Sequence, residues 1–177
     1  MMLPVAGSVL KVHDPFSRAL VETLSGCSRT RTYLTYTTGK DYRVGPPAAP
    51  IAEIEDLTAE ALLLFSHNGY TAEEMTDHFH RGATWFGLRL EGQIRSACFV
   101  FQNHERMWEV AGVYTPPQYR RMGYAKSVVQ AAIRKLTDTG RVPRYQFRDD
   151  NIGSRGVAEA LRLQHVLTVN HYVTPTT

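Results

Sequence analysis

Cysteine is scarce in this sequence. Only two of the 177 residues are cysteines, Cys27 and Cys98, so at most one disulfide bond could form. Such sparse cysteine is typical of proteins from a reducing compartment. Long hydrophobic runs are also absent, and the first ten residues lack the basic leading region of a secretory signal. We therefore expect a cytoplasmic protein that has no membrane partner.

An excess of charge of one sign is lacking too. The net charge is only +3, from 20 Lys and Arg against 17 Asp and Glu. Residues 1–48 hold six of these basic residues against three acidic ones, and the rest of the chain balances with 14 of each. No dense basic run with interleaved aromatic residues is present, which argues against a nucleic-acid partner. A nucleic-acid module built on the basic N-terminal segment remains the weakest alternative.

The familiar nucleotide-binding motifs are missing as well. The chain contains neither Gly-x-x-x-x-Gly-Lys-Ser/Thr nor Gly-x-Gly-x-x-Gly. Residues 109–126 instead begin with an apolar strand that ends at Tyr114, where two prolines prevent further strand pairing. A short loop follows, and an amphipathic helix begins near Gly123. Unpaired backbone N–H groups and the positive end of the helix dipole bind phosphate well at such a helix start. The segment predicts an anion site, with an ordinary surface turn as the alternative, and its basic side chains would add positive charge: Arg120, Arg121 and Lys126.

The spacing within this loop is more specific than that of a general anion site. Residues 120–125 read Arg-Arg-Met-Gly-Tyr-Ala and match Arg/Gln-x-x-Gly-x-Gly/Ala, the pyrophosphate loop of the GNAT acyltransferases. The strand that ends at 113–116 fits the family strand before the loop, and Asn151-Ile152-Gly153-Ser154 resembles the Asn-x-x-Ser start of the family's next helix. The chain therefore resembles the GNAT superfamily of N-acetyltransferases, most strongly over residues 85–173.

This resemblance implies an α/β fold with a mixed, mostly antiparallel central sheet that is flanked by helices and splayed around an acetyl-CoA site. We expect the acetyltransferase domain at residues 49–177 and an N-terminal extension, residues 1–48, that packs on it, because the proline-rich stretch 45–50 marks a boundary. The apolar patterns predict helices over 9–24, 57–66, 71–81, 123–138 and 151–163, and strands over 31–38, 85–90, 93–102, 107–114, 145–148 and 166–173.

The end of the chain departs from the family pattern. GNAT domains usually finish with two strands, but only residues 166–173 remain for a final strand here. Two alternatives would fill the missing place. The strand at 31–38 could occupy it, or a second subunit could supply it, which would make the protein a homodimer.

The resemblance also implies a reaction, the transfer of an acetyl group from acetyl-CoA to a primary amine of a small molecule or peptide. Carried over residue by residue, the family's strand end would hold the pantetheine arm, with a backbone N–H near Val113 polarising the thioester carbonyl. The loop would hold the pyrophosphate, and the Asn-x-x-Ser segment would hold the arm from the other side. The residues so assigned to acetyl-CoA are Val113, Tyr114, Thr115, Arg120, Arg121, Met122, Gly123, Tyr124, Ala125, Lys126, Asn151 and Ser154.

Glu109 is the candidate catalytic base. Strand alternation places it on the face shared with Met107 and Ala111, where a carboxylate is out of character unless it reaches the cleft. Its separation from Arg120 also matches the place where histone-acetyltransferase-like GNATs keep a catalytic Glu. A pKa raised by apolar surroundings would suit it to accept a proton, directly or through water. A salt-bridged or edge-exposed acid is an equally weighted alternative.

A family proton donor is missing. GNATs that acetylate protein N-termini carry a Glu five residues before the helix Asn and a Tyr seven residues after it, but this chain has Gln146 and Ala158 at those positions. The usual Tyr that protonates the departing thiolate is therefore absent, which leaves Tyr172, Tyr114 or solvent. The same gap keeps open a different class of function, a non-catalytic acyl-CoA-binding sensor or subunit.

A metal site is not predicted. Asp77, His78 and His80 are close in sequence, but two histidines two residues apart diverge on a helix. They indicate a polar helix face. The variable helices over residues 57–81 and the last strand would build the acceptor site, and their sequences form no pattern that identifies one amine.

Overall fold

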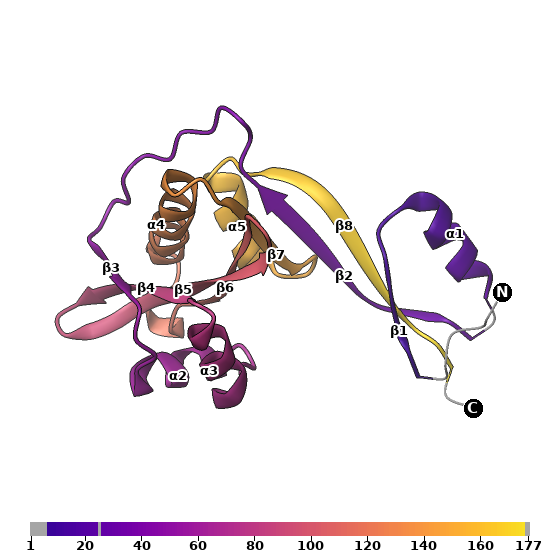
Figure 1. Ribbon diagram of the computed structural model, residues 1–177, viewed down its shortest axis with the longest axis horizontal. Helices are drawn as coiled ribbons and strands as arrows, with labels where there is room; N and C mark the ends of the chain where they lie inside the picture. Colours follow the sequence, from indigo (N-terminus) through magenta and orange to yellow (C-terminus); the bar gives the residue numbers. More distant parts are fainter. Residues whose placement is uncertain (1–6, 25, 176–177) are drawn as a thin grey trace.

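The computed structural model describes residues 7–24 and 26–175. Their strands form one eight-stranded sheet in the order β1-β8-β2-β7-β6-β5-β4-β3 (Figure 1). All neighbouring strands are antiparallel except β6 and β7, which are parallel. The strands are β1 (Val9–Val12), β2 (Ser28–Thr37), β3 (Ile51–Ile54), β4 (Thr84–Leu90), β5 (Gln93–His104), β6 (Met107–Tyr114), β7 (Val142–Arg148) and β8 (Gln164–Val173). The predicted fold class, a mixed and mostly antiparallel sheet flanked by helices, is confirmed.

Helices cover both faces of the sheet (Figure 1). On one face lie α4 (Tyr124–Asp138) and α5 (Ile152–Ala160), and on the other lie α2 (Ala59–Ser66) and α3 (Ala72–His80). Alternate residues of β5 point to opposite faces of the sheet. Cys98 packs in the cluster with α4, and Phe99 packs in the cluster with α2 and α3. Both faces of this strand are therefore buried, and Cys98 is a small, fully buried core residue. No described helix combines the length and apolar character needed to cross a membrane.

The N-terminal segment enters the sheet itself. Strand β2 lies between β7 and β8, with Tyr36 opposite Tyr145 on one side and Thr37 opposite Gln164 on the other. It fills the place of the missing family strand, as the first of the two alternatives proposed. Strands β2 and β8 extend beyond the main body as an arm, where β1 pairs with β8 and α1 (Pro15–Thr23) covers a small apolar cluster (Figure 1).

Two boundaries in the N-terminal part differ from the prediction. The helix expected over 9–24 begins only at Pro15, because Asp14 accepts a hydrogen bond from the Ser17 backbone N–H at 2.7 Å and caps the helix there. Residues 9–12 form β1 instead. The chain after the proline-rich stretch forms the short strand β3, which has too few residues to show a strand period.

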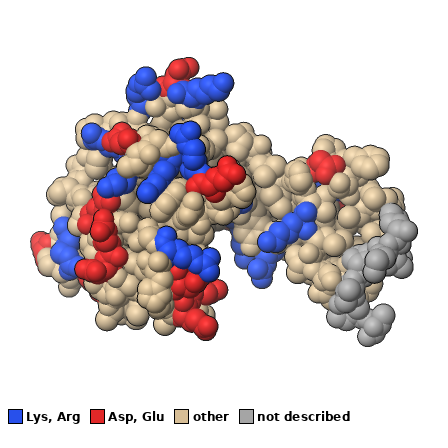
Figure 2. Space-filling view, in the orientation of Figure 1, with Lys and Arg blue, Asp and Glu red and all other residues tan. Residues whose placement is uncertain are grey.

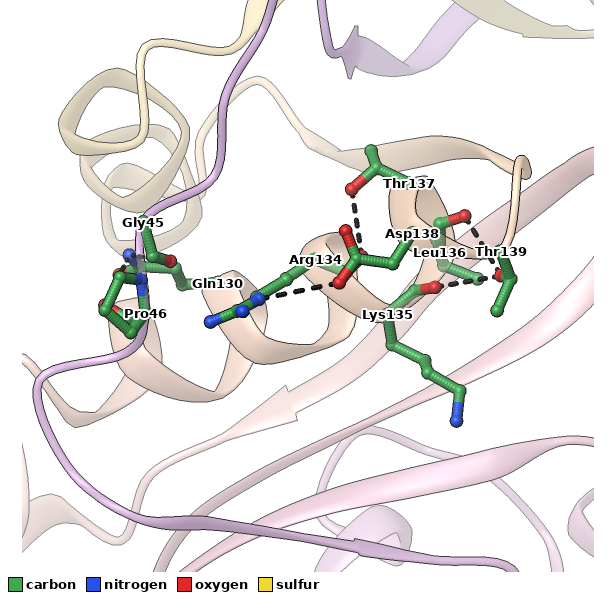
Figure 3. A network of polar contacts seen from close by, with 9 residues as sticks. All are labelled: Gly45, Pro46, Gln130, Arg134, Lys135, Leu136, Thr137, Asp138 and Thr139. Carbon is green, nitrogen blue, oxygen red and sulfur yellow. Dashed lines mark hydrogen bonds and ion pairs between the residues drawn. The ribbon is translucent and has the colours of Figure 1, made fainter.

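The proline-rich stretch itself runs across α4. The Gln130 side-chain amide donates to the carbonyl oxygens of Gly45 and Pro46 at 3.0 and 3.1 Å (Figure 3). Lys135, further along α4, pairs with Glu53 of β3 at 2.7 Å. These contacts fix the path between the arm and the first helix of the main body.

Two boundaries in the C-terminal half also differ. Strand β7 begins at Val142, before the predicted 145, and Pro143 lies opposite Trp108 of β6, ahead of the stretch of β7 that also pairs with β2. Helix α5 ends at Ala160 and not at 163, because Arg162 has a positive φ of 52° and the Leu163 N–H closes the helix end on the Ala158 carbonyl at 2.9 Å.

Candidate active site

The sheet opens between β6 and β7. The two strands pair only from Met107 opposite Val142 to Val110 opposite Tyr145, and beyond these residues neither strand has a partner in the other. A cavity of about 730 Å³ lies at this opening. Because unpaired strand ends leave backbone groups available, the opening is the natural place for an extended ligand.

A β-bulge turns the end of β6 toward the cavity. Ala97 of β5 lies opposite Tyr114 of β6, and Phe99, two residues later, lies opposite Ala111, three residues earlier. Strand β6 therefore has one extra residue in this stretch. Gly112 lies within this bulge at a φ of 60°, and a Cβ atom there would come within 2.6 Å of the Phe99 ring and 2.9 Å of the Phe65 ring. The strand can therefore bulge here only because residue 112 has no side chain. Sequence reasoning missed the bulge, although a glycine inside a strand is its usual signal.

Gly112→Ala is expected to destabilise the protein by about 3 kcal/mol or more, because positive φ strain and overpacking add together. Gly92→Ala is the matched control. Gly92 also has a positive φ, 77°, but a Cβ atom added there would meet no other atom within 4 Å, so only the strain of about 1 kcal/mol applies. Urea unfolding of both variants checks the difference. Equal losses would contradict the close packing at Gly112.

The phosphate side of the cavity is formed by the loop before α4. The chain leaves β6, makes a short 3-10 turn over Pro117–Tyr119, and reaches Gly123, which caps α4 at a φ of 78° without any side-chain hydrogen bond. The first backbone N–H groups of α4 are thus left for a ligand. Arg121 and Lys126 also line the cavity, and neither has an acidic partner among the described residues. The geometry and the charge are those of an anion site.

The opposite wall comes from α5 and β7. Asn151 caps α5 by accepting a hydrogen bond from the Ser154 backbone N–H at 3.0 Å, which leaves its amide nitrogen as the group it can offer a ligand. Ser154 lines the cavity beside it, and so does Tyr145 from β7. Tyr145 was not among the predicted site residues. Its aromatic character in a strand predicts only core packing.

The end of α2 closes the cavity over β6, which the sequence did not indicate. The His67 ring stacks on the Tyr114 ring at 4.4 Å between centroids and 7° between planes. The Asn68 side chain donates to the Val113 carbonyl at 3.4 Å. Both residues line the cavity. No local signal could have revealed them, because the contact joins segments that are 45 residues apart.

The cavity brings together nearly all the residues predicted to bind acetyl-CoA. It is lined by Val113, Tyr114, Thr115, Arg120, Arg121, Gly123, Tyr124, Ala125, Lys126, Asn151 and Ser154. Met122 belongs to the loop, but its side chain is 57% exposed and is not part of the wall. Glu109 does not line the cavity either.

Glu109 lies opposite Phe101 of β5 and on the strand face of Ala111, both of which pack in the cluster with α2 and α3, and it is one residue before the last residue of β6 that pairs with β7. Its carboxylate is buried and accepts hydrogen bonds from Arg144 at 2.8 Å, from Asn103 at 3.2 Å, and from the Gln146 backbone N–H. Burial raises the pKa of Glu109 to about 7, although the nearby Arg144 charge acts in the opposite direction. The salt-bridged state and the raised pKa, which were alternatives in the sequence, occur together in the structure.

The other residues singled out in the sequence are separate from this site. Tyr172 donates to Glu22 at 2.7 Å within the arm, so it is not near the cavity. His78 packs on the Phe101 ring at 4.1 Å, whereas His80 is exposed. Among residues 7–24 and 26–175 no three side chains of the metal-binding types come together.

A mixed sheet that splays beside an uncapped, glycine-started helix is the architecture of the GNAT acetyltransferases. The model of the acetyltransferase (GNAT) family matches residues 51–162, more than half of the chain. The protein therefore belongs to the GNAT family.

Solved structures agree on the fold. A GCN5-related N-acetyltransferase from Sphaerobacter thermophilus superposes with a TM-score of 0.71 at 13% identity, over 97% of this chain and 62% of that one. A GNAT-family acetyltransferase from Colwellia psychrerythraea gives 0.71 at 14% identity, over 96% and 65%. A tandem GNAT protein from the clavulanic acid biosynthesis pathway gives 0.69 at 13%, over 94% and 63%.

The chain thus spans less than two-thirds of the length of these three proteins. At such low identities the likeness concerns the fold alone. A comparison with curated protein sequences gives no significant match.

Proposed function

We propose that this protein is an acetyl-CoA-dependent N-acetyltransferase that acts on a primary amine of a small molecule or peptide. One observation carries the proposal. The start of α4, which has no side-chain cap, the basic side chains of Arg121 and Lys126, and the bulged end of β6 all line the same cavity. Acyl-CoA needs the same combination, an anion site for its pyrophosphate and free backbone groups for its arm.

The residues present fit acetyl-CoA. The loop from Arg120 to Ala125, with Lys126, would hold the pyrophosphate through backbone N–H groups and positive charge. Val113, Tyr114 and Thr115 would hold the arm on one side. Asn151 and Ser154 would hold it on the other. Bound there, acetyl-CoA would supply the acetyl group as an activated thioester.

The protein's own groups would carry out the rest of the reaction. A backbone N–H at the bulge near Val113 would polarise the thioester carbonyl, because a fixed dipole acts strongly where water is excluded. Glu109 would take a proton from the amine, directly or through water. Its pKa of about 7 matches that task near neutral pH. Its carboxylate accepts a hydrogen bond from the backbone N–H of Gln146, the first residue of β7 beyond the stretch that pairs with β6, and this supports a role for Glu109 near the opening.

A non-catalytic acyl-CoA sensor or subunit is the second candidate. Two observations favour it. Ala158 stands where some family members have a catalytic Tyr, and Glu109 is ion-paired and outside the cavity wall. The two functions differ in one measurable result, because only the enzyme releases free CoA when a suitable amine is added.

Calorimetric titration with acetyl-CoA tests both candidates first. We expect binding within the range of about 1 μM to 1 mM that is typical of enzyme substrates. Thiol release on addition of a panel of primary amines, detected with a thiol reagent, then separates enzyme from sensor. Absence of acetyl-CoA binding would exclude both functions.

We also propose a cytoplasmic location and no nucleic-acid partner. Cys27 and Cys98 are unpaired thiols in the structure, as expected for a reducing compartment. Basic and acidic side chains are interspersed over the main body on the face in Figure 2, without the broad positive area that nucleic acid requires. Pairing into a homodimer and a domain boundary near residue 48 remain proposals that gel filtration and truncation would test.

A further inference from the structure

The face of the sheet that carries Glu109 continues from the main body onto the arm. Residues that lie opposite one another in neighbouring strands share a face, so this face can be followed from strand to strand. Helices α2 and α3 pack on it only over β4, β5 and β6, and α1, α4 and α5 lie on the other face (Figure 1). Its part on the arm therefore has no described helix over it. From β6 to β1 this face carries Glu109, Gln146, Thr35, Arg31, His171 and Lys11.

Three side chains of the arm form a basic row across this face. Lys11 of β1 lies opposite His171 of β8, and His171 lies opposite Arg31 of β2. Burial, and the nearby charges of Lys11 and Arg31, lower the pKa of His171. Lys11 and Arg31 are exposed, and neither forms an ion pair with a carboxylate of the described residues. In Figure 2, Lys and Arg side chains line the arm beside the notch that separates it from the main body. The basic row is therefore a positive site without a counter-charge among the described residues.

Polar and aromatic groups connect Glu109 with the basic row. The Glu109 carboxylate accepts a hydrogen bond from the Gln146 backbone N–H, and the Gln146 side-chain amide donates to the Thr35 hydroxyl at 2.8 Å. Tyr33 follows Thr35 on this face of β2, and its ring centroid lies 4.7 Å from that of His171. The face thus offers hydrogen bonds and ring surface to an extended ligand along its whole course.

The two ends of this face differ in charge. Burial raises the pKa of Tyr70 to about 12, and the charges of Glu109 and Glu74 act on the hydroxyl in the same direction. Glu74 belongs to the first turn of α3, so negative charge gathers near Glu109, whereas positive charge gathers on the arm. A complementary ligand has an amine at one end and carboxylates at the other.

The separation of the two ends selects the size of the ligand. The basic row is two strands away from β6, and it is displaced along the strands by four residues of β7, from Arg144 to Arg148, and by two of β2, from Tyr33 to Arg31. With about 4.8 Å between strands and about 3.3 Å per residue, the row lies roughly 22 Å from Glu109. An extended peptide covers this distance in about seven residues. A small-molecule amine is too short to contact both ends.

We propose that the acceptor is a peptide whose acidic segment docks on the basic row of Lys11, His171 and Arg31, about seven residues from its reactive amine. This inference rests on the proposed acetyltransferase function and selects a peptide over a small molecule. It also gives the positive N-terminal segment a role. Nucleic acid fits this face less well, because it is held by many phosphate contacts and the row has only two permanent charges.

Fluorescence anisotropy tests the docking without any acetyl transfer. The probe is a synthetic peptide with a free N-terminus, a neutral spacer of about six residues, a run of glutamates and a C-terminal label. We expect it to bind the CoA-loaded parent about tenfold more tightly than a peptide with glutamines in place of the glutamates, since each exposed ion pair contributes a small factor. The double variant Lys11→Gln, Arg31→Gln should lose this difference.

Arg29→Gln is the matched control. Arg29 is also exposed and also lies on β2, but a register shift separates it from Arg31 and places it opposite Tyr172, on the face covered by α1. It removes one positive charge of the arm without touching the basic row, so it should bind the glutamate peptide as the parent does. Equal weakening by Arg29→Gln, or equal binding of the two peptides to the parent, would overturn the inference. Displacement of the peptide by duplex DNA at a lower concentration than by unlabelled peptide would overturn it too.

Thiol release provides a second readout. With acetyl-CoA and the glutamate peptide, the double variant should show a KM about tenfold higher than the parent and the same kcat, because the row binds the peptide away from the reacting atoms. With a small primary amine that carries no carboxylate, the double variant should match the parent in both constants. Moving the glutamates next to the amine should raise the parent KM to the value for the glutamine peptide.

The outcomes separate the docking site from the proposed function. Thiol release with a small amine, together with equal KM values for the glutamate and glutamine peptides, would overturn the docking site and leave the acetyltransferase intact. A protein that binds the glutamate peptide but releases no thiol with any amine would overturn the proposed function, and the role of the peptide as acceptor with it.

Discussion

Gly123→Glu is expected to abolish acetyl-CoA binding, lowering the affinity by more than about 1,000-fold. Gly123 caps α4 in the middle of the loop, so a carboxylate there would lie where the pyrophosphate is held and would take the unpaired N–H groups for itself. No atom lies within 4 Å of a Cβ atom built on Gly123, so the new side chain has room and the fold should persist. Calorimetric titration of the variant with acetyl-CoA measures the loss.

Gly123→Gln is the matched control for that experiment. It brings the same bulk and the same positive-φ strain of about 1 kcal/mol, but no negative charge. We expect the Gln variant to bind acetyl-CoA more weakly than the parent by about tenfold at most, and far better than the Glu variant. Equal loss in both would show that backbone strain, and not charge, prevents binding, and it would contradict the anion site.

Glu109→Gln is expected to reduce kcat about 100-fold to 1,000-fold and to leave the affinity for acetyl-CoA unchanged, because a general base acts on the amine and not on the CoA. Since the pKa of Glu109 is raised to about 7, the parent rate should rise with pH as the carboxylate loses its proton near that value. The Gln variant should lack this rise. The measurement is the rate of thiol release with one reactive amine from about pH 5.5 to 8.5. The rate should rise with pH in the parent alone.

Glu105→Gln is the control for Glu109→Gln. Glu105 is an exposed acid in the turn between β5 and β6, only four residues away in sequence, so its amide variant should keep the parent rate and pH profile. A Glu109→Gln protein with unchanged rate and pH profile would assign Glu109 a purely structural role as the partner of Arg144.

The raised pKa of Glu109 also affects stability. A carboxyl whose pKa is 4.5 when unfolded and about 7 when folded binds more protons in the folded state between these values. The parent should therefore lose stability as the pH rises from about 4.5 to 7. Glu109→Gln removes this contribution, so the two unfolding curves should diverge over that pH range.

The phosphate loop and the start of α4 line the cavity together with His67 and Asn68 at the end of α2. Glu109 lies outside the cavity wall, on the strand face of Ala111, which packs in the cluster with α2 and α3. The parallel pairing of β6 and β7 ends one residue after Glu109 and leaves a gap between the two strands. The gap follows from the short parallel pairing of these strands and from Gly112, whose missing side chain permits the bulge.

Local features of the candidate site were predictable from sequence. The loop from Arg120 to Ala125, the helix start at Gly123 and the cap at Asn151 each depend on residues within a few positions of one another, and backbone geometry alone brings their N–H groups together. Strand alternation also placed Glu109 correctly on a buried face.

Long-range packing decided the remaining features. The insertion of β2 between β7 and β8 joins segments more than 100 residues apart, and no local pattern specifies such pairing. The Arg144 partner of Glu109, the Asn68 contact with Val113 and the position of Tyr145 in the cavity wall likewise arise where distant segments meet. The sequence by itself determined the family and the anion loop, because contiguous residues encode them. Only the tertiary structure decided which strand completes the sheet, which groups surround Glu109 and which distant side chains line the cavity, because those depend on contacts that form when the whole chain packs.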